Sequence, residues 1–462
     1  MLNTSDLLAP IIATARERLR AVSISDEPQD DATNGDLFAR AYAGSVLSVN
    51  GGWWVYDTRA GKWVQDLDRS FVRRLAVDIG IQRREAVGFS DRAREALRWA
   101  TYSLSASGIR AMLELAASEP ALMGSRDEFD ANPDAVLDAA GQCIDLRTGT
   151  ARPATPEDRF TRALGAVFDP DATCPLWERF LLESFCGDIE LVLFHQRWRG
   201  YNLTARTSEQ KALIAAGFGG NGKSIESSAF EAVAGEYSRT LSSSLFTPQR
   251  GTTAPAYELA ELPGVRVCFV RETPPDGQFD ESLFKSATGE NTLTARSPYQ
   301  RPFTFAPVFK VSFETNHLPR IRTQNAAMWR RLFCEYWNNT PAIPDPLLGE
   351  KLMAELPGIL TWAIRGSATW YKFGLQPPDA VTAAVKQYRE GEDVLKDFID
   401  GFRLDPAASI GAGDLYSRYR TYAESNGLKQ MSAPAFKDAL GERGFSHKHT
   451  STGSRFYGLG VQ

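Results

Sequence analysis

The sequence has few cysteines and no excess of basic residues. Its five cysteines are spread over 462 residues without a C-x-x-C pair, which argues against a zinc ribbon and against a secreted disulfide framework. We therefore expect reduced, mostly buried thiols. Lys and Arg number 52 against 57 Asp and Glu, a formal net charge of -5, so no global basic field indicates a nucleic-acid partner. A channel or hairpin needs only local positive charge, and net charge leaves such a partner open.

Long apolar runs and targeting signals are also missing. No run reaches the roughly 18 apolar residues of a membrane helix. The early stretch LLAPIIATA follows Asp6 and precedes Arg16, which reverses the charge order of a signal peptide. The sequence shows no internal repeat or low-complexity tract. We expect a cytoplasmic protein, of a bacterial host, with no membrane partner.

Hydrophobic patterning predicts four regions. Residues 1–150 are typical of an α-rich region with a β-hairpin, because SVLSVNGGWWVYDTRAGKWVQD alternates aromatic and polar residues around a turn. Residues 151–205 predict a helical collar, and residues 206–375 alternate helix and strand as in a parallel α/β core. QPPD marks a boundary at residues 376–379. Three helical stretches and a terminal hairpin follow it. Residues 380–462 therefore predict a winged helix.

Residues 217–224 read GFGGNGKS and match two phosphate-binding fingerprints. The glycines fit the G-x-G-x-x-G of a dinucleotide fold, whereas Gly222, Lys223 and Ser224 close the G-x-x-x-x-G-K-[ST] of a P-loop. The dinucleotide pattern also needs a carboxylate about 20 residues later, and YSRTLSSSL offers none. The P-loop gives Lys223 the β and γ phosphates and Ser224 the magnesium ion. We therefore predict a P-loop.

Three later segments carry polar residues that suit a nucleotide site. Glu272 follows the strand-like run in VRVCFVRET, where a P-loop needs an acid. Asn316 ends FKVSFETN, where an amide can orient water or touch a γ phosphate, although asparagine is also a common turn residue. Arg330 and Arg331 in MWRRLF suit either surface ion pairs or charge stabilisation at a phosphoryl group.

These motifs together resemble a known family. GFGGNGKS, FVRET, the K-x-x-T-G-E of residues 285–290, TARSPYQRPFTFAPVFKVSFETNHLPRI and WRRLF are similar to superfamily 3 helicases of the phage and plasmid primase-helicase group. Poxvirus and satellite-phage replication proteins belong to the same group. The resemblance covers residues 35–462. It implies an α/β, AAA+-like P-loop NTPase that acts as an ATP-dependent DNA helicase of a phage, plasmid or other mobile element.

The resemblance also implies roles for individual residues. It makes Glu272 the Walker B acid, Asn316 the polar sensor, and Arg331, or else Arg330, the arginine finger. ATP would be bound by Gly217, Phe218, Gly219, Gly220, Asn221, Gly222, Lys223 and Ser224, and Mg²⁺ by Ser224 and Glu272. Residues 293–305 would form a DNA-gripping hairpin with Arg296, Tyr299, Gln300 and Arg301 near its tip. The implied partners are single-stranded and replication-fork DNA, further copies of the chain in a hexamer, and a separate primase.

The sequence departs from the family at three places. Arg271 precedes Glu272 where some relatives carry a second acid, which leaves magnesium to Ser224 and Glu272. NAAMWRR lacks the aspartate often found before the tryptophan, which bears on the choice of arginine finger. Residues 1–150 are too few for a primase domain and lack an evident carboxylate constellation for nucleotide polymerisation, so we expect no primase activity.

Alternatives remain at the level of the sequence. Trp53, Trp54, Tyr56 and Trp63 could stack on single-stranded bases, but aromatic residues of a hairpin more often pack on a sheet. An initiator or defence ATPase that uses ATP to assemble on DNA without unwinding would carry the same motifs. A small-molecule P-loop kinase is disfavoured because no segment after the core resembles an acceptor-binding lid.

Overall fold

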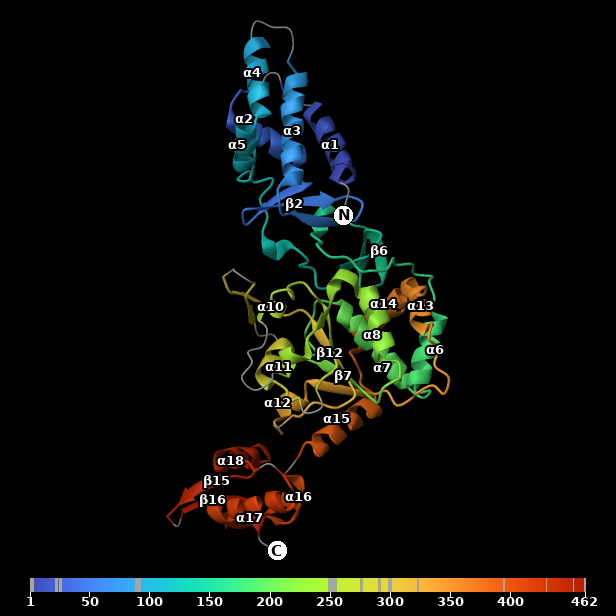
Figure 1. Cartoon of the computed structure of the whole chain (residues 1–462), viewed down its shortest axis with the longest axis vertical. Coiled ribbons are helices and arrows are strands. Elements are labelled where there is room, and N and C mark those ends of the chain that lie inside the picture. Colours follow the sequence, from blue (N-terminus) through green and yellow to red (C-terminus); the bar gives the residue numbers. More distant parts are fainter. Residues whose placement is uncertain are drawn as a thin grey trace.

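The chain folds into three regions arranged along its long axis (Figure 1). The computed structural model describes residues 4–20, 24, 27–87, 93–247, 256–274, 277–289, 292–297, 301–321, 324–393, 395–428, 430–451 and 453–460. Within these ranges no helix is long and apolar enough to cross a membrane. The five cysteines are free thiols, and all but Cys186 are buried, as the sequence predicts.

The N-terminal region is a set of helices beside a small antiparallel sheet. Its elements are α1 (Thr4–Arg20), α2 (Asp31–Tyr42), β1 (Val46–Val49), β2 (Gly52–Asp57), β3 (Lys62–Asp66), α3 (Ser70–Glu85), α4 (Ala93–Ser103) and α5 (Ala106–Ala116). The predicted hairpin is present as the antiparallel pair β1-β2. A second turn adds the strand β3, which the prediction did not include, and gives the three-stranded sheet β1-β2-β3. The first turn is Asn50-Gly51, with φ values of 50° and 78°, a sequence typical of two-residue hairpin loops.

The aromatic residues of this sheet pack inside the protein. Trp53, Trp54, Tyr56 and Trp63 are 3%, 8%, 4% and 1% exposed, and the Tyr56 and Trp63 rings lie 5.5 Å apart between centroids. Buried rings present no face to a nucleic-acid base. The interpretation that they pack on the sheet is confirmed, and base stacking by these four residues is wrong.

Short strands and two helices connect this region to the core. They are η1 (Arg126–Glu128), β4 (Ala135–Leu137), β5 (Gln142–Asp145), β6 (Thr150–Pro153), η2 (Pro156–Asp158), α6 (Pro175–Ser184) and α7 (Ile189–Leu203). Asp134, just before β4, accepts hydrogen bonds from Arg147 at 2.6 Å and from Arg206 at 2.5 Å. Arg206 follows α7, so this ion pair fixes the strands β4-β5-β6 to the start of the core.

A five-stranded parallel sheet forms the centre of the core. Its strands are β7 (Ala212–Ala216), β8 (Ser238–Leu241), β9 (Val267–Arg271), β12 (Lys310–Thr315) and β13 (Leu332–Tyr336), in the order β13-β7-β12-β9-β8. The strands are rich in apolar residues, as expected of a sheet covered on both faces. The prediction of a parallel α/β core is confirmed. Because all five strands are parallel, the loops after them gather at one edge.

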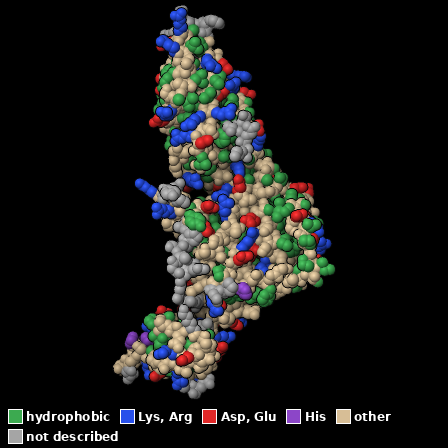
Figure 2. Space-filling view, in the orientation of Figure 1, with side chains coloured by type: hydrophobic (Ala, Val, Ile, Leu, Met, Phe, Trp, Pro, Cys, Tyr) green, Lys and Arg blue, Asp and Glu red, His purple; other side chains and the backbone are tan. Residues whose placement is uncertain are grey.

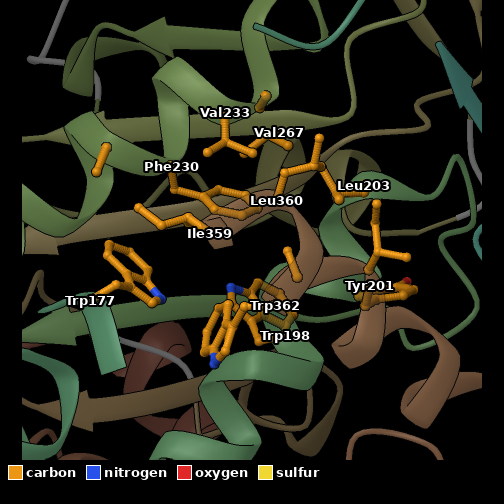
Figure 3. Packing of buried hydrophobic residues seen from close by; sticks show 14 of the residues in the cluster. Trp177, Trp198, Tyr201, Leu203, Phe230, Val233, Val267, Ile359, Leu360 and Trp362 are labelled. Carbon is orange, nitrogen blue, oxygen red and sulfur yellow. The ribbon is translucent and has the colours of Figure 1, made fainter. Parts of the chain in front are cut away.

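Helices cover the sheet, and short elements join its strands. They are α8 (Lys223–Ala234), η3 (Gly235–Tyr237), α9 (Ser243–Phe246), α10 (Ala256–Leu259), α11 (Glu281–Ala287), β10 (Leu293–Ala295), β11 (Phe303–Phe305), α12 (Ala326–Trp329), α13 (Leu348–Met353), α14 (Leu356–Phe373) and α15 (Asp379–Gly391). The largest buried cluster lies where α7 and α14 pack together and against α8. Figure 3 shows its aromatic centre, where the Trp177 and Trp362 rings lie 5.6 Å apart between centroids. Helices α6 and α7 are therefore part of the core packing.

The C-terminal region has a hydrophobic cluster of its own. It consists of α16 (Lys396–Asp400), β14 (Arg403–Gly411), α17 (Ala412–Ser425), α18 (Ala433–Glu442), β15 (His447–Thr450) and β16 (Gly453–Gly460). The three strands form an antiparallel sheet in the order β14-β16-β15. Strand β14 is absent from the expectation of three helices and a hairpin, because RLDPAASIG lacks a clear apolar alternation and contains Pro406.

Candidate functional site

The predicted P-loop joins the buried strand β7 to the start of α8. Gly217 begins the loop beside β13, where a Cβ atom would lie 2.3 Å from the carbonyl oxygen of Trp337. Gly222 has a φ of 89°, and a Cβ there would lie 2.7 Å from the Phe180 ring. Both positions therefore require glycine. Phe218, at 81% exposure, lies on the outer side of the loop.

Lys223 is folded back under this loop. Its ammonium group donates to the carbonyl of Gly217 at 2.7 Å and to the side-chain oxygen of Asn221 at 2.9 Å. Asn221 in turn donates to the carbonyl of Trp337 at 2.5 Å. Lys223 is only 6% exposed, and burial lowers its pKa, an effect that nearby Glu314 opposes. The structure thus holds a lysine inside a glycine loop at a helix N-terminus, an arrangement suited to phosphate.

The predicted acid and amide lie at the C-terminal ends of the strands, as the P-loop does. Asn316 directly follows β12, and its side-chain oxygen lies 3.4 Å from the Lys223 nitrogen. Glu272 directly follows β9, and its backbone N–H donates to the carbonyl of Glu314 at 3.1 Å. Glu272 has a φ of 56°, a strained conformation for a residue other than glycine that concentrates at functional sites. Lys223 and Asn316 are therefore in contact, Glu272 follows the neighbouring strand β9, and the roles of these three residues stay predictions.

A buried carboxylate that the sequence analysis did not single out lies beside these residues. Glu314 on β12 is 6% exposed and pairs in register with Arg271 of β9 and Ala215 of β7. Its Oε1 atom lies 3.3 Å from Nε of Arg271. Burial raises the pKa of Glu314, against the hydroxyls of Ser227 and Ser224 and the Arg271 charge, which lower it. A glutamate inside the strand-like run FKVSFETN, next to Phe313, is the signal that could have identified it.

The two candidate arginine fingers lie at the N-terminal ends of the strands, whereas the P-loop follows the C-terminal end of β7. Arg331 immediately precedes β13, and its backbone carbonyl accepts from Ala212, the first residue of β7. Its Nη1 atom donates to the carbonyl of Ala327 at 2.5 Å, and Arg330 donates to Gln210 at 3.3 Å. The length of β7, about 15 Å at 3.3 Å per residue, separates these arginines from the P-loop of the same chain. The structure does not bring them to the loop.

The predicted hairpin projects from the side of the core. Strands β10 and β11 pair antiparallel, with Leu293 opposite Phe305, which confirms the hairpin. Figure 2 shows basic side chains gathered on this projection, at the position of the yellow strand pair in Figure 1. Arg296 and Arg301 flank the tip and are exposed. Tyr299 and Gln300 lie outside the described residues.

A buried charged cluster fixes the P-loop helix from the inside. The His195 ring on α7 lies between two carboxylates, 3.0 Å from Oε1 of Glu226 on α8 and 3.0 Å from Oε2 of Glu335 on β13. Arg199 donates to Glu226 at 2.8 Å. Burial lowers the pKa of His195, but Glu335 and Glu226 outweigh it and raise the pKa to about 9. Burial likewise opposes ionisation of Glu226, but Arg199 and His195 lower its pKa to about 2.

Comparisons with known proteins find relatives in large DNA viruses. The family model described as D5 N terminal like matches residues 35–186. A protein of Acanthamoeba polyphaga mimivirus is 29% identical over 247 residues, which are 48% of this chain and 26% of that protein. A protein of Frog virus 3 is 26% identical over 246 residues, 47% of this chain and 25% of that protein. Both carry the name "putative helicase". The chain thus spans about a quarter of the length of the curated relatives it matches.

Solved structures share the fold over most of the chain. Two apo structures of the NrS-1 C-terminal region each cover 90% of this chain and 96% of their own, with TM-scores of 0.50 and 0.52 and 10% identity. At this identity the likeness concerns the fold alone.

The matched domain and the viral relatives make this chain similar to primase-helicase-like proteins of phages and viruses. These matches confirm the resemblance to phage and viral primase-helicases that the sequence motifs indicate.

Proposed function

We propose that the protein is an ATP-dependent DNA helicase of superfamily 3, with an AAA+-like P-loop core. The observation that carries the proposal is the position of Lys223, which is held inside a glycine loop and lies 3.4 Å from Asn316 of the adjacent strand. A lysine, a helix N-terminus and a polar strand end around one space suit the β and γ phosphates of ATP. The viral relatives named as helicases support the same class of activity.

Each residue at this edge has a role in hydrolysis. Lys223 leaves its carbonyl partners to neutralise the β and γ phosphates, and the loop N–H groups donate to them. Asn316 orients the attacking water from the adjacent strand end. Glu272 would polarise that water and, with Ser224, would hold Mg²⁺, which would supply charge neutralisation. The donor set fits this ion, since magnesium is usually held by one or two carboxylates together with substrate phosphates.

The position of Arg331, at the strand ends opposite the P-loop, supports a ring of several copies of the chain. Arg331 is too far from its own P-loop to reach ATP, so it would act on the nucleotide of a neighbouring copy. A hexamer, which the superfamily implies, places such an arginine at each subunit interface. In this arrangement ATP turnover depends on assembly.

DNA contacts are assigned to two surfaces. The β10-β11 hairpin would carry Arg296 and Arg301, with Tyr299 and Gln300, into the ring channel and grip the phosphate backbone of single-stranded DNA. The C-terminal helices and sheet, which we infer to be a winged helix, would bind replication-fork DNA. A separate primase would supply primers.

The experiment that tests the proposal is ATP hydrolysis with and without single-stranded DNA. Stimulation by DNA supports the proposal, and turnover that responds to a small-molecule acceptor but not to DNA would indicate a kinase. A replication initiator or defence switch would also show DNA-stimulated turnover but would not separate strands.

A further inference from the structure

Strand β9 ends in Arg271, at the position where some relatives of the helicase family carry a second acid. The Arg271 guanidinium contacts helix α8. Its Nη2 atom lies 2.9 Å from Oε2 of Glu231 and 3.4 Å from the hydroxyl of Ser228, both on α8. Its Nε atom lies 3.3 Å from Oε1 of Glu314. Arg271 therefore connects β9 to α8 and to the neighbouring strand β12.

Arg271 contacts only the Oε1 oxygen of Glu314, and the other oxygen, Oε2, has no hydrogen-bond partner among the described residues. Oε2 is also buried. A buried acceptor without a partner costs free energy and calls for an explanation. Arg271, which contacts Oε1 of Glu314, also lies 3.4 Å from the hydroxyl of Ser227 on α8. The Glu314 carboxylate thus lies on the face of the sheet that α8 covers.

We propose that Glu314, on the strand next to the P-loop strand, takes the place of the acid that β9 lacks and anchors the magnesium shell beneath Ser224. The inference rests on the proposed ATPase function and deepens it. In this assignment Arg271 is a positioning residue, because it holds Oε1 and thereby directs Oε2 toward Ser224. Glu272 keeps both roles proposed above, beside the attacking water and, with Ser224, at the magnesium ion.

The register of the sheet supports the replacement of an acid on β9 by Glu314 on β12. Glu314 and Arg271 are direct partners across β12 and β9, so their side chains emerge from the same face, the one that α8 covers. Strand β12 also lies between β9 and β7. A carboxylate on β12 is therefore one strand closer to the P-loop than a carboxylate at position 271 would be.

The test measures how magnesium affects ATP binding rather than turnover. A fluorescent ATP analogue is titrated into the full chain with Mg²⁺ and with EDTA, for the wild type, Glu314→Gln and Glu231→Gln. Glu231→Gln is the matched control, because it removes the other carboxylate that pairs with Arg271 and leaves Glu314 in place. Loss of a residue that orients the metal shell typically weakens metal affinity 10- to 100-fold. We expect a Mg²⁺ midpoint raised by about that factor in Glu314→Gln, with EDTA binding unchanged and Glu231→Gln like the wild type.

A Mg²⁺ midpoint for Glu314→Gln equal to that of Glu231→Gln overturns the inference. If Glu314→Gln does not fold by circular dichroism, Glu314→Asp replaces it, since the shorter acid keeps the charge but moves the carboxylate away from Ser224. A wild-type midpoint in Glu314→Asp then overturns the inference. Failure of the wild-type chain to bind the analogue under any condition would instead contradict the proposed ATPase function.

Discussion

Replacing His195 by Gln should remove a pH-dependent contribution of about 3 kcal/mol to the stability of the core. The folded pKa of about 9 exceeds the ordinary value of 6.5, and each pH unit corresponds to about 1.4 kcal/mol. The charged groups that face the ring are Glu226 from α8 and Glu335 from β13, with Arg199 from its own helix bound to Glu226. The protonated ring is stabilised by these two carboxylates.

The sign of the effect follows from the raised pKa. Below pH 6.5 the ring is protonated in both the folded and the unfolded chain, and its contribution is fully present. As the pH rises from 6.5 to 9, the unfolded chain loses this proton first, and the contribution is lost. The lowered pKa of Glu226 acts in a different window, where stability falls as the pH drops below about 4.5. His195 therefore accounts for the fall in the free energy of unfolding between pH 6.5 and 9.

Urea unfolding followed by tryptophan fluorescence at pH 6, 7, 8 and 9 measures this effect. The wild-type free energy of unfolding should fall more steeply than that of His195→Gln, and the difference between the two curves removes the titration of all other groups. His317→Gln, at an exposed histidine, is the control and should follow the wild type. Parallel curves for the wild type and His195→Gln would refute the reasoning.

The remaining predictions concern the nucleotide and DNA sites. Lys223→Ala should abolish ATP hydrolysis while the circular dichroism spectrum stays that of the wild type, whereas Glu272→Gln should still bind ATP; normal turnover in Lys223→Ala would exclude the P-loop. Arg331→Ala should lose about 10³ to 10⁵ in turnover, and mixing it with Lys223→Ala chains should restore some activity; no recovery in rings shown to be mixed argues against action on a neighbour. Arg296→Ala with Arg301→Ala should keep DNA-free ATPase, abolish unwinding and flatten the salt dependence of DNA binding; wild-type unwinding would move the DNA contact elsewhere.

The sequence predicts best where a motif fixes local geometry. GFGGNGKS and the apolar run before it predict the strand, loop and helix around Lys223, because glycine spacing and burial act over a few residues. Glu272 and Asn316 are placed correctly for a similar reason, since each directly ends a strand of a parallel sheet. The β10-β11 hairpin also follows from local pattern.

Long-range contacts explain what the sequence analysis missed. The Glu314–Arg271 pair depends on β12 lying between β9 and β7, an order that no local pattern specifies. The cluster around His195 joins residues 31 and 140 positions apart, and a lone histidine in IELVLFHQRW gives no sign of it. Strand β14 pairs with β16 across about fifty residues of chain, so its weak alternation did not identify it.

Strand displacement on a forked DNA substrate tests the central proposal most directly. The wild-type chain with ATP and Mg²⁺ should release the labelled strand, and Lys223→Ala on the same substrate should not. DNA-stimulated ATP hydrolysis without strand release, from assembled wild-type protein, would contradict the helicase proposal and indicate an ATP-dependent switch on DNA.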